Sequence, residues 1–293
     1  MEPLTVIYKQ VEGCAIRADV YGAPPNGLPR PAIVQIHGGA LIMGSREWLA
    51  PYLHSILEDG WVVISIDYRL APETKLPMII QDLRDAFRWV REEGPARFGI
   101  DPLRIGVVGH SAGGYLTLMA GCVALPRPKA LVSFYGYGDL IGDWLSKPDP
   151  FYRTFASVSE EQARGVVGEA PLSGVTEETR DRGSFYLYCR QNGAWPVEVS
   201  GFDPLTQPEA LAPYCPVRQV TADFPPALLL HGDADTDVPH AQSVLMADAL
   251  ARAGVEHELI TIPGGAHGFD GETDKPTVSD ALARAGAFMR KHV

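Results

Sequence analysis

A serine lies between glycines in the segment GHSAGG at 109–114. The segment follows an apolar stretch at 104–108, expected to be a strand, and opens an expected helix at 112–124. A G-x-S-x-G sequence in this setting is typical of a nucleophilic serine, because flanking side chains would clash in so tight a turn. The helix N-terminus also presents free N–H groups to an oxyanion. We therefore predict that Ser111 is a nucleophile.

A serine hydroxyl reacts only when a base takes its proton, and an acid must orient that base. Both partners are expected later in the chain, at the carboxyl ends of strands. His267 lies in a glycine-rich loop after an expected strand at 257–262, and we predict that it is the base. The acid is one of three residues that follow an expected strand at 227–230, and spacing alone does not separate them: Asp233, Asp235 and Asp237.

The other histidines are weaker candidates for the base. His240 lies at an expected helix start and His257 at a strand start, so we interpret both as surface or packing residues. Four more have no comparable loop setting: His54, His110, His231 and His292.

A second glycine-rich turn, HGGA at 37–40, follows an expected strand at 32–36. Backbone N–H groups in such a turn can point at a substrate carbonyl. We predict an oxyanion hole formed by the N–H groups of Gly38, Gly39 and Ala112.

Together HGGA at 37–40, DYRLAPE at 67–73 and GHSAGG at 109–114 resemble the α/β-hydrolase superfamily, and within it the hormone-sensitive-lipase-like serine esterases. HGDADTDVP at 231–239 is more similar to the prolyl oligopeptidase and dienelactone hydrolase branches, and that resemblance implies Asp235 as the triad acid. Three charged residues of DYRLAPE are interpreted as braces of the loop beside the oxyanion turn: Asp67, Arg69 and Glu73.

The expected elements alternate between strands and helices, which favours the α/β class with a mostly parallel central sheet and helices on both faces. Strands at 4–11 and 15–21 are expected to form an opening antiparallel pair. Further strands are expected at 61–66 and 130–134, and further helices at 47–58, 77–92, 240–252 and 277–291.

The periodicity lapses after the strand at 130–134. We therefore predict a hydrolase core over 1–137 and 224–293 with an inserted cap over 138–223. Seven aromatic residues are candidates for an acyl or alcohol pocket, although packing is the better explanation for any one of them taken singly: Trp48, Tyr135, Tyr137, Trp144, Phe151, Tyr152 and Trp195.

The composition and charge of the chain disfavour some classes of binding partner. The net charge is −11 and no run of Lys and Arg forms a basic patch, which disfavours nucleic acid and anionic membranes. The four cysteines form no CxxC pair, and the start of the chain lacks the pattern of a signal peptide. We expect a cytoplasmic protein with no cofactor and no metal; the oligomeric state is open, and a homodimer is one possibility.

These observations predict a serine hydrolase that cleaves carboxylic esters through an acyl-enzyme. Two alternatives stay open: an amidase, peptidase or transacylase with the same triad, and a non-catalytic ligand-binding protein of the same fold.

Overall fold

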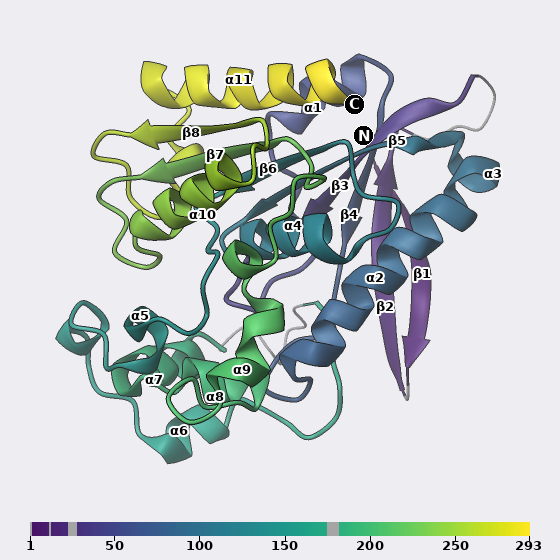
Figure 1. Cartoon of the computed structure of the whole chain (residues 1–293). Coiled ribbons are helices and arrows are strands. Elements are labelled where there is room, and N and C mark those ends of the chain that lie inside the picture. The colour runs from purple at the N-terminus through teal and green to yellow at the C-terminus, as the bar shows by residue number, and fades with distance from the viewer. Residues whose placement is uncertain (1, 12, 23–27, 175–181) are drawn as a thin grey trace.

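The computed structural model describes residues 2–11, 13–22, 28–174 and 182–293. Its centre is one eight-stranded sheet with the order β1-β2-β4-β3-β5-β6-β7-β8 (Figure 1). Only β2 runs against its neighbours, so the sheet is mostly parallel and opens with an antiparallel pair, as expected. The strands are β1 (Leu4–Val11), β2 (Cys14–Tyr21), β3 (Arg30–Ile36), β4 (Val62–Ile66), β5 (Ile100–His110), β6 (Ala130–Phe134), β7 (Ala227–Gly232) and β8 (His257–Ile262).

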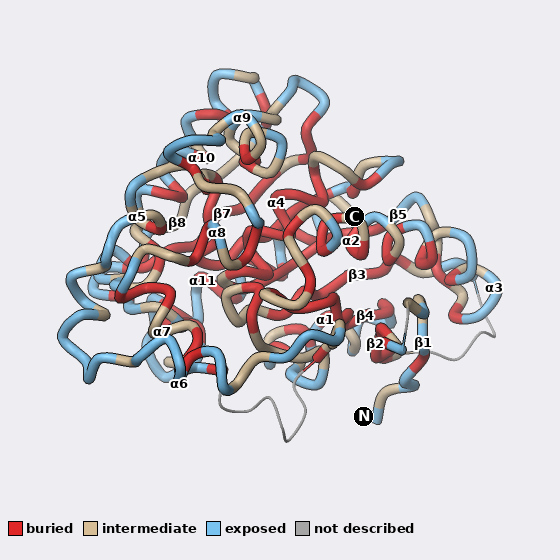
Figure 2. The backbone as a smooth tube through the Cα atoms, turned by 90° about the horizontal axis from the view of Figure 1, so that it is seen from below, coloured by how far each residue is buried: buried red, intermediate tan, exposed pale blue. Residues whose placement is uncertain are grey.

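Helices cover both faces of the sheet, and the predicted fold class is confirmed. On one face α2 (Leu76–Glu92), α4 (Ala112–Val123) and α10 (Ala241–Arg252) contribute to one apolar core. On the other face α1 (Leu53–Glu58) and α11 (Pro276–His292) contribute to a second core. The central strands are buried almost throughout, as runs of apolar residues predict (Figure 2).

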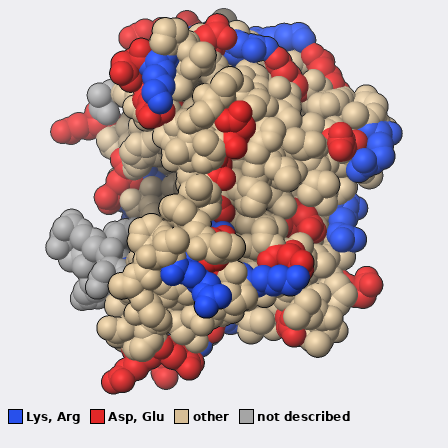
Figure 3. All heavy atoms as spheres, turned by 90° about the vertical axis from the view of Figure 1, so that its left-hand side faces the viewer, with Lys and Arg blue, Asp and Glu red and all other residues tan. Residues whose placement is uncertain are grey.

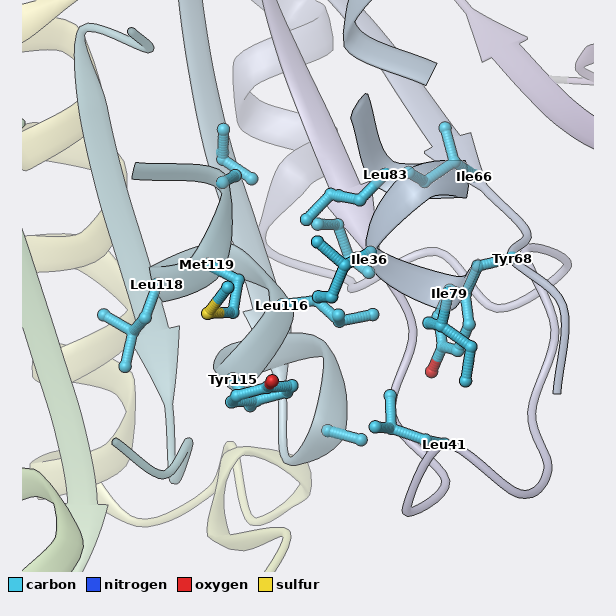
Figure 4. Close-up of a cluster of buried hydrophobic side chains, with 14 of the residues drawn as sticks. Ile36, Leu41, Ile66, Tyr68, Ile79, Leu83, Tyr115, Leu116, Leu118 and Met119 are labelled. Atoms are coloured by element: carbon cyan, nitrogen blue, oxygen red, sulfur yellow. The ribbon is translucent and has the colours of Figure 1, made fainter. Parts of the chain in front are cut away.

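The larger core fixes α4, and with it the residue that precedes α4. Ile79 and Leu83 of α2 belong to the same apolar core as Leu116 and Met119 of α4, and the two helices are in contact (Figure 4). All four side chains are at most 1% exposed. This close packing holds α4 in place, and so it also fixes the position of Ser111, the residue that precedes α4.

The expected helix at 47–58 is wrong in its first half, because regular helix begins only at Leu53. The buried side chain of Gln35 accepts a hydrogen bond from Ala50 N at 2.9 Å and donates one to Trp48 O at 2.6 Å. These bonds occupy backbone groups that a helix would need, and Pro51 disfavours helical backbone in the residue before it. A short helix that was not predicted, α3 (Gly94–Phe98), precedes β5.

The segment between β6 and β7 forms short helices in its described residues and gathers below the sheet in Figure 1. Trp195 Nε1 donates to Ala40 O at 3.1 Å, so the segment contacts the turn after β3. The boundaries 138–223 of a cap remain a prediction. Its helices are α5 (Asp143–Ser146), α6 (Glu160–Arg164), α7 (Gly183–Asn192), α8 (Trp195–Ser200) and α9 (Pro208–Leu211), with 3₁₀ turns at Tyr152–Thr154, Ala212–Tyr214 and Pro216–Arg218.

The surface of Figure 3 carries Lys and Arg in small groups beside Asp and Glu. Within the described ranges, no helix combines the length and apolar character needed to cross a bilayer.

Candidate active site

Ser111 occupies the turn between β5 and α4 with φ 57° and ψ −120°, a conformation rare for a residue with a side chain. A Cβ on Gly113 would lie 2.0 Å from Ile36 O, and a Cβ on Gly109 would lie 2.2 Å from Gly113 O. The turn is therefore closed to larger residues at both positions, which is the steric reason for the G-x-S-x-G spacing.

The fold brings the predicted serine, histidine and one aspartate into a chain of hydrogen bonds. His267 Nε2 lies 3.0 Å from Ser111 Oγ, and His267 Nδ1 lies 2.7 Å from Asp235 Oδ2. Asp235 Oδ1 accepts from the N–H groups of Asp237 and Val238 at 2.8 and 2.9 Å. Because three different strands end beside these groups, residues far apart in the sequence meet at one edge of the sheet.

The structure separates the three aspartates that spacing left equivalent. Asp233 Oδ1 accepts from Gly264 N at 2.6 Å and so joins two loops. Asp237 accepts hydrogen bonds from Tyr186 and Arg190 of α7. Only Asp235 of the three bonds to Nδ1 of His267 in the described part of the chain.

Other histidines have hydrogen-bond partners other than Ser111, although His231 Nε2 also lies 3.3 Å from Asp235 Oδ2. His240 Nε2 lies 2.9 Å from Thr261 Oγ1, and His257 Nδ1 lies 2.8 Å from Val255 O. His231 lies between Ser243 Oγ at 2.7 Å and Val238 O at 2.9 Å. Three more have partners away from Ser111: His54 at Pro51, His110 at Asp270 and His292 at Glu256.

The charges around His267 favour its protonated form. Burial alone would lower the pKa of His267, but the hydrogen bond to Asp235 and the charges of Asp237, Asp235 and Asp270 raise it above its ordinary value. Burial would likewise raise the pKa of Asp235, yet hydrogen bonds from His231 and His267 hold it well below its usual range. The pair can thus carry a proton on His267 beside an ionised Asp235.

The predicted oxyanion turn is close to the serine. A Cβ on Gly38 would lie 2.8 Å from His110 O, and Gly39 has φ 100°. Tyr68 stacks on His37 and donates to His37 O at 3.0 Å, which fixes the turn. None of the N–H groups of the predicted oxyanion hole, those of Gly38, Gly39 and Ala112, donates a hydrogen bond to another described residue.

The three charged residues of the DYRLAPE segment form charged hydrogen bonds, and Ala71 N of the same segment donates to Leu41 O, just after the turn, at 2.8 Å. Asp67 pairs with Arg46 at 2.8 Å and Arg69 with Asp82 at 2.7 Å. Glu73 pairs with Arg182 at 2.6 Å.

A small hollow adjoins Ser111, and its walls include Ala40, Leu145 and Val238. Of the predicted aromatic candidates, it is lined by Tyr137, Trp144 and Trp195. Two further lining residues, Tyr186 and Arg190, come from α7 and were missed, since no periodicity or motif singles them out.

The remaining aromatic candidates do not line the hollow. The ring of Tyr135 lies 4.6 Å from that of His267, and Trp48 packs against His110. Phe151 is 41% exposed, and Tyr152 stacks near Arg190. Over the described residues, no three His, Cys, Asp or Glu side chains are grouped as a metal ion would need.

Comparison with known proteins agrees with this architecture. The non-reducing polyketide synthase ausA of Aspergillus calidoustus is 32% identical over 99% of this chain, which spans 14% of that protein. A protein of unknown function from Staphylococcus aureus subsp. aureus Mu50 has a TM-score of 0.76 at 21% identity, with 99% of each chain covered. A propionate-bound esterase from Thermogutta terrifontis has a TM-score of 0.68 at 24% identity, with 99% and 94% covered.

The two solved structures share the fold, including the sheet that places Ser111, His267 and Asp235 together. The model of the BD-FAE family matches residues 18–250, which is most of the chain. The chain therefore belongs to the BD-FAE family.

Proposed function

We propose that the protein hydrolyses carboxylic esters through a triad of Ser111, His267 and Asp235. The observation that carries the proposal is the pair of distances at His267, 3.0 Å to Ser111 Oγ and 2.7 Å to Asp235 Oδ2. Both lie within the range that proton transfer and its orientation require.

In the first step Ser111 Oγ attacks the ester carbonyl carbon while its proton passes to His267 Nε2. The carbonyl electron pair moves onto oxygen, and the N–H groups of Gly38, Gly39 and Ala112 would bind the resulting oxyanion. Collapse of this intermediate breaks the ester C–O bond, and His267 returns the proton to the leaving alcohol. Water repeats the sequence on the acyl-enzyme and releases the acid.

Asp235 acts through His267. Its carboxylate accepts from Nδ1, which leaves Nε2 without a proton and directed at the serine. Once Nε2 is protonated, the same carboxylate stabilises the imidazolium. The low pKa of Asp235 keeps it ionised over the working range.

The small volume of the hollow favours a short acyl or alcohol group. Side chains line it closely and leave little free space beside Ser111. The bound propionate in the Thermogutta esterase fits the same size class. We treat 138–223 as the cap that supplies most of the walls. The free thiols of all four cysteines suit a reducing compartment, so we place the protein in the cytoplasm.

The test measures kcat/KM on nitrophenyl acetate and butyrate and on the matching anilides, for the wild type and for Ser111→Ala. Ester turnover should fall by about 10⁴–10⁶-fold in the variant. Ser279→Ala is the matched control, because Ser279 is exposed and its hydroxyl donates to Pro276 O within its own helix. Near wild-type turnover in Ser111→Ala contradicts the proposal, and faster cleavage of the anilides would replace the esterase by an amidase.

A further inference from the structure

One residue that lines the hollow beside Ser111 has a buried hydroxyl that the hydrolytic steps do not use. Tyr137 follows β6, stacks on Tyr115 at 4.8 Å and packs edge-on against Trp144 and Trp195. The residue is 3% exposed, and its hydroxyl has no hydrogen-bond partner among the described residues. Burial, aided by the charge of Asp237, raises the pKa of Tyr137 well above its ordinary value, so the hydroxyl keeps its proton.

A second donor lies in the same wall. Arg190 is 1% exposed and its guanidinium is held by Asp237 and Asp149, each at 2.6 Å. Tyr152 packs over the same guanidinium, 4.6 Å from ring centre to Cζ. These contacts fix the group, yet its Nε–H is buried and has no partner within the described part of the chain.

Unpaired donors in a protein interior are costly, and few are found in native structures. Both donors here belong to residues that line the small hollow containing the nucleophile. An oxygen atom of the bound substrate could accept hydrogen bonds from both the Tyr137 hydroxyl and Arg190 Nε–H. Such an acceptor explains why neither donor has a partner among the described residues.

We propose that this hollow selects esters that carry a second, uncharged oxygen acceptor, such as a keto, ether or hydroxyl oxygen, which binds the Tyr137 hydroxyl and Arg190 Nε–H. The inference rests on the proposed esterase function and names its substrate class. The guanidinium of Arg190 pairs with two carboxylates, those of Asp149 and Asp237, so this side of the hollow has a net negative charge. That charge disfavours an anionic acceptor. Tyr137 and Arg190 are thus specificity-determining residues.

The experiment uses pairs of esters that differ by one oxygen. The acyl pair is nitrophenyl levulinate and nitrophenyl isocaproate, in which a keto oxygen replaces a methyl group. The alcohol pair is para-methoxyphenyl acetate and para-ethylphenyl acetate. Nitrophenyl hemisuccinate supplies an anionic acceptor. Each kcat/KM is measured for the wild type, for Tyr137→Phe and for the control Tyr188→Phe, since Tyr188 lies on α7 and does not line the hollow.

Tyr137→Phe should lower kcat/KM for the oxygen-bearing member of one pair by about tenfold to a hundredfold, and change the alkyl member by less than about threefold. Tyr188→Phe should change neither, and the hemisuccinate should be the poorest acyl substrate. Because each ester is its own reference, differences in intrinsic reactivity cancel. Equal effects of Tyr137→Phe on both members of both pairs overturn the inference and leave the esterase proposal standing. Absence of turnover on every ester overturns the esterase proposal itself.

Discussion

Asp237 Oδ2 lies 3.5 Å from His267 Nε2, the nitrogen that faces Ser111. A second carboxylate therefore borders the imidazole on its reactive side, in addition to Asp235 at Nδ1. Asp237 also binds Arg190 of α7 at 2.6 Å, so it links the imidazole to the segment between β6 and β7. The loop after β7 thus supplies both the orienting acid and a charge that favours the protonated histidine.

This placement predicts a pH dependence. His267 must be neutral to take the serine proton, so kcat/KM should rise with pH through the pKa of His267, above its ordinary value near 6.5. Asp237→Asn removes a negative charge that raises this pKa. The acidic limb of the pH profile should therefore move to lower pH. Asp233→Asn is the control, since Asp233 lies in the same loop and bonds to Gly264 N; its profile should match the wild type. An acidic limb that stays in place or moves to higher pH in Asp237→Asn contradicts this reading.

The bidentate pair of Glu73 and Arg182 predicts a stability effect. Both side chains are at most 1% exposed, with N–O distances of 2.6 and 2.9 Å. Glu73→Gln leaves the Arg182 charge buried without its counterion, which should lower the free energy of unfolding by about 3–5 kcal/mol. Asp143→Asn breaks the exposed pair with Lys147 and should cost only about 0.3–0.5 kcal/mol. Chemical denaturation of both variants provides the measurement, and equal losses would refute the bracing role.

The glycine of the serine turn gives a third test. A Cβ at Gly113 would overlap Ile36 O at 2.0 Å, and the contact is backbone on a buried strand, so it cannot move aside cheaply. Gly113→Ala should lower the free energy of unfolding by more than about 3 kcal/mol. At Gly183, in the first turn of α7, an added Cβ meets no atom of the described residues within 4 Å. Gly183→Ala should therefore stay within about 1 kcal/mol of the wild type. A stable Gly113→Ala protein would show that the turn can relax.

Much of the fold could be predicted because buried parallel strands are apolar runs between turn signals. The strands at 32–36 and 130–134 were found in this way, and so was the helix that follows Ser111. The first half of 47–58 could not be predicted, since its backbone is held by Gln35 from another strand. A long-range hydrogen bond of this kind leaves no local pattern.

The candidate site likewise contains residues that the sequence predicts and residues that it does not. Ser111 and His267 could be predicted because a tight turn and a glycine-rich loop leave a mark in the sequence, whereas choosing Asp235 over Asp237 needed family resemblance. The structure shows why: the two side chains lie two residues apart and both approach His267. Arg190 and Tyr186 reach the hollow only through the packing of α7, which no spacing encodes.

The most direct test of the account is covalent labelling with a fluorophosphonate, which reacts with an activated serine hydroxyl. We expect mass spectrometry to find one adduct on the wild type, located on the peptide that contains Ser111. Ser111→Ala should carry none, and His267→Ala should label far more slowly because the serine loses its base at 3.0 Å. An unlabelled wild type, or an adduct that persists in Ser111→Ala, would contradict the central claim that Ser111 is the nucleophile of this protein.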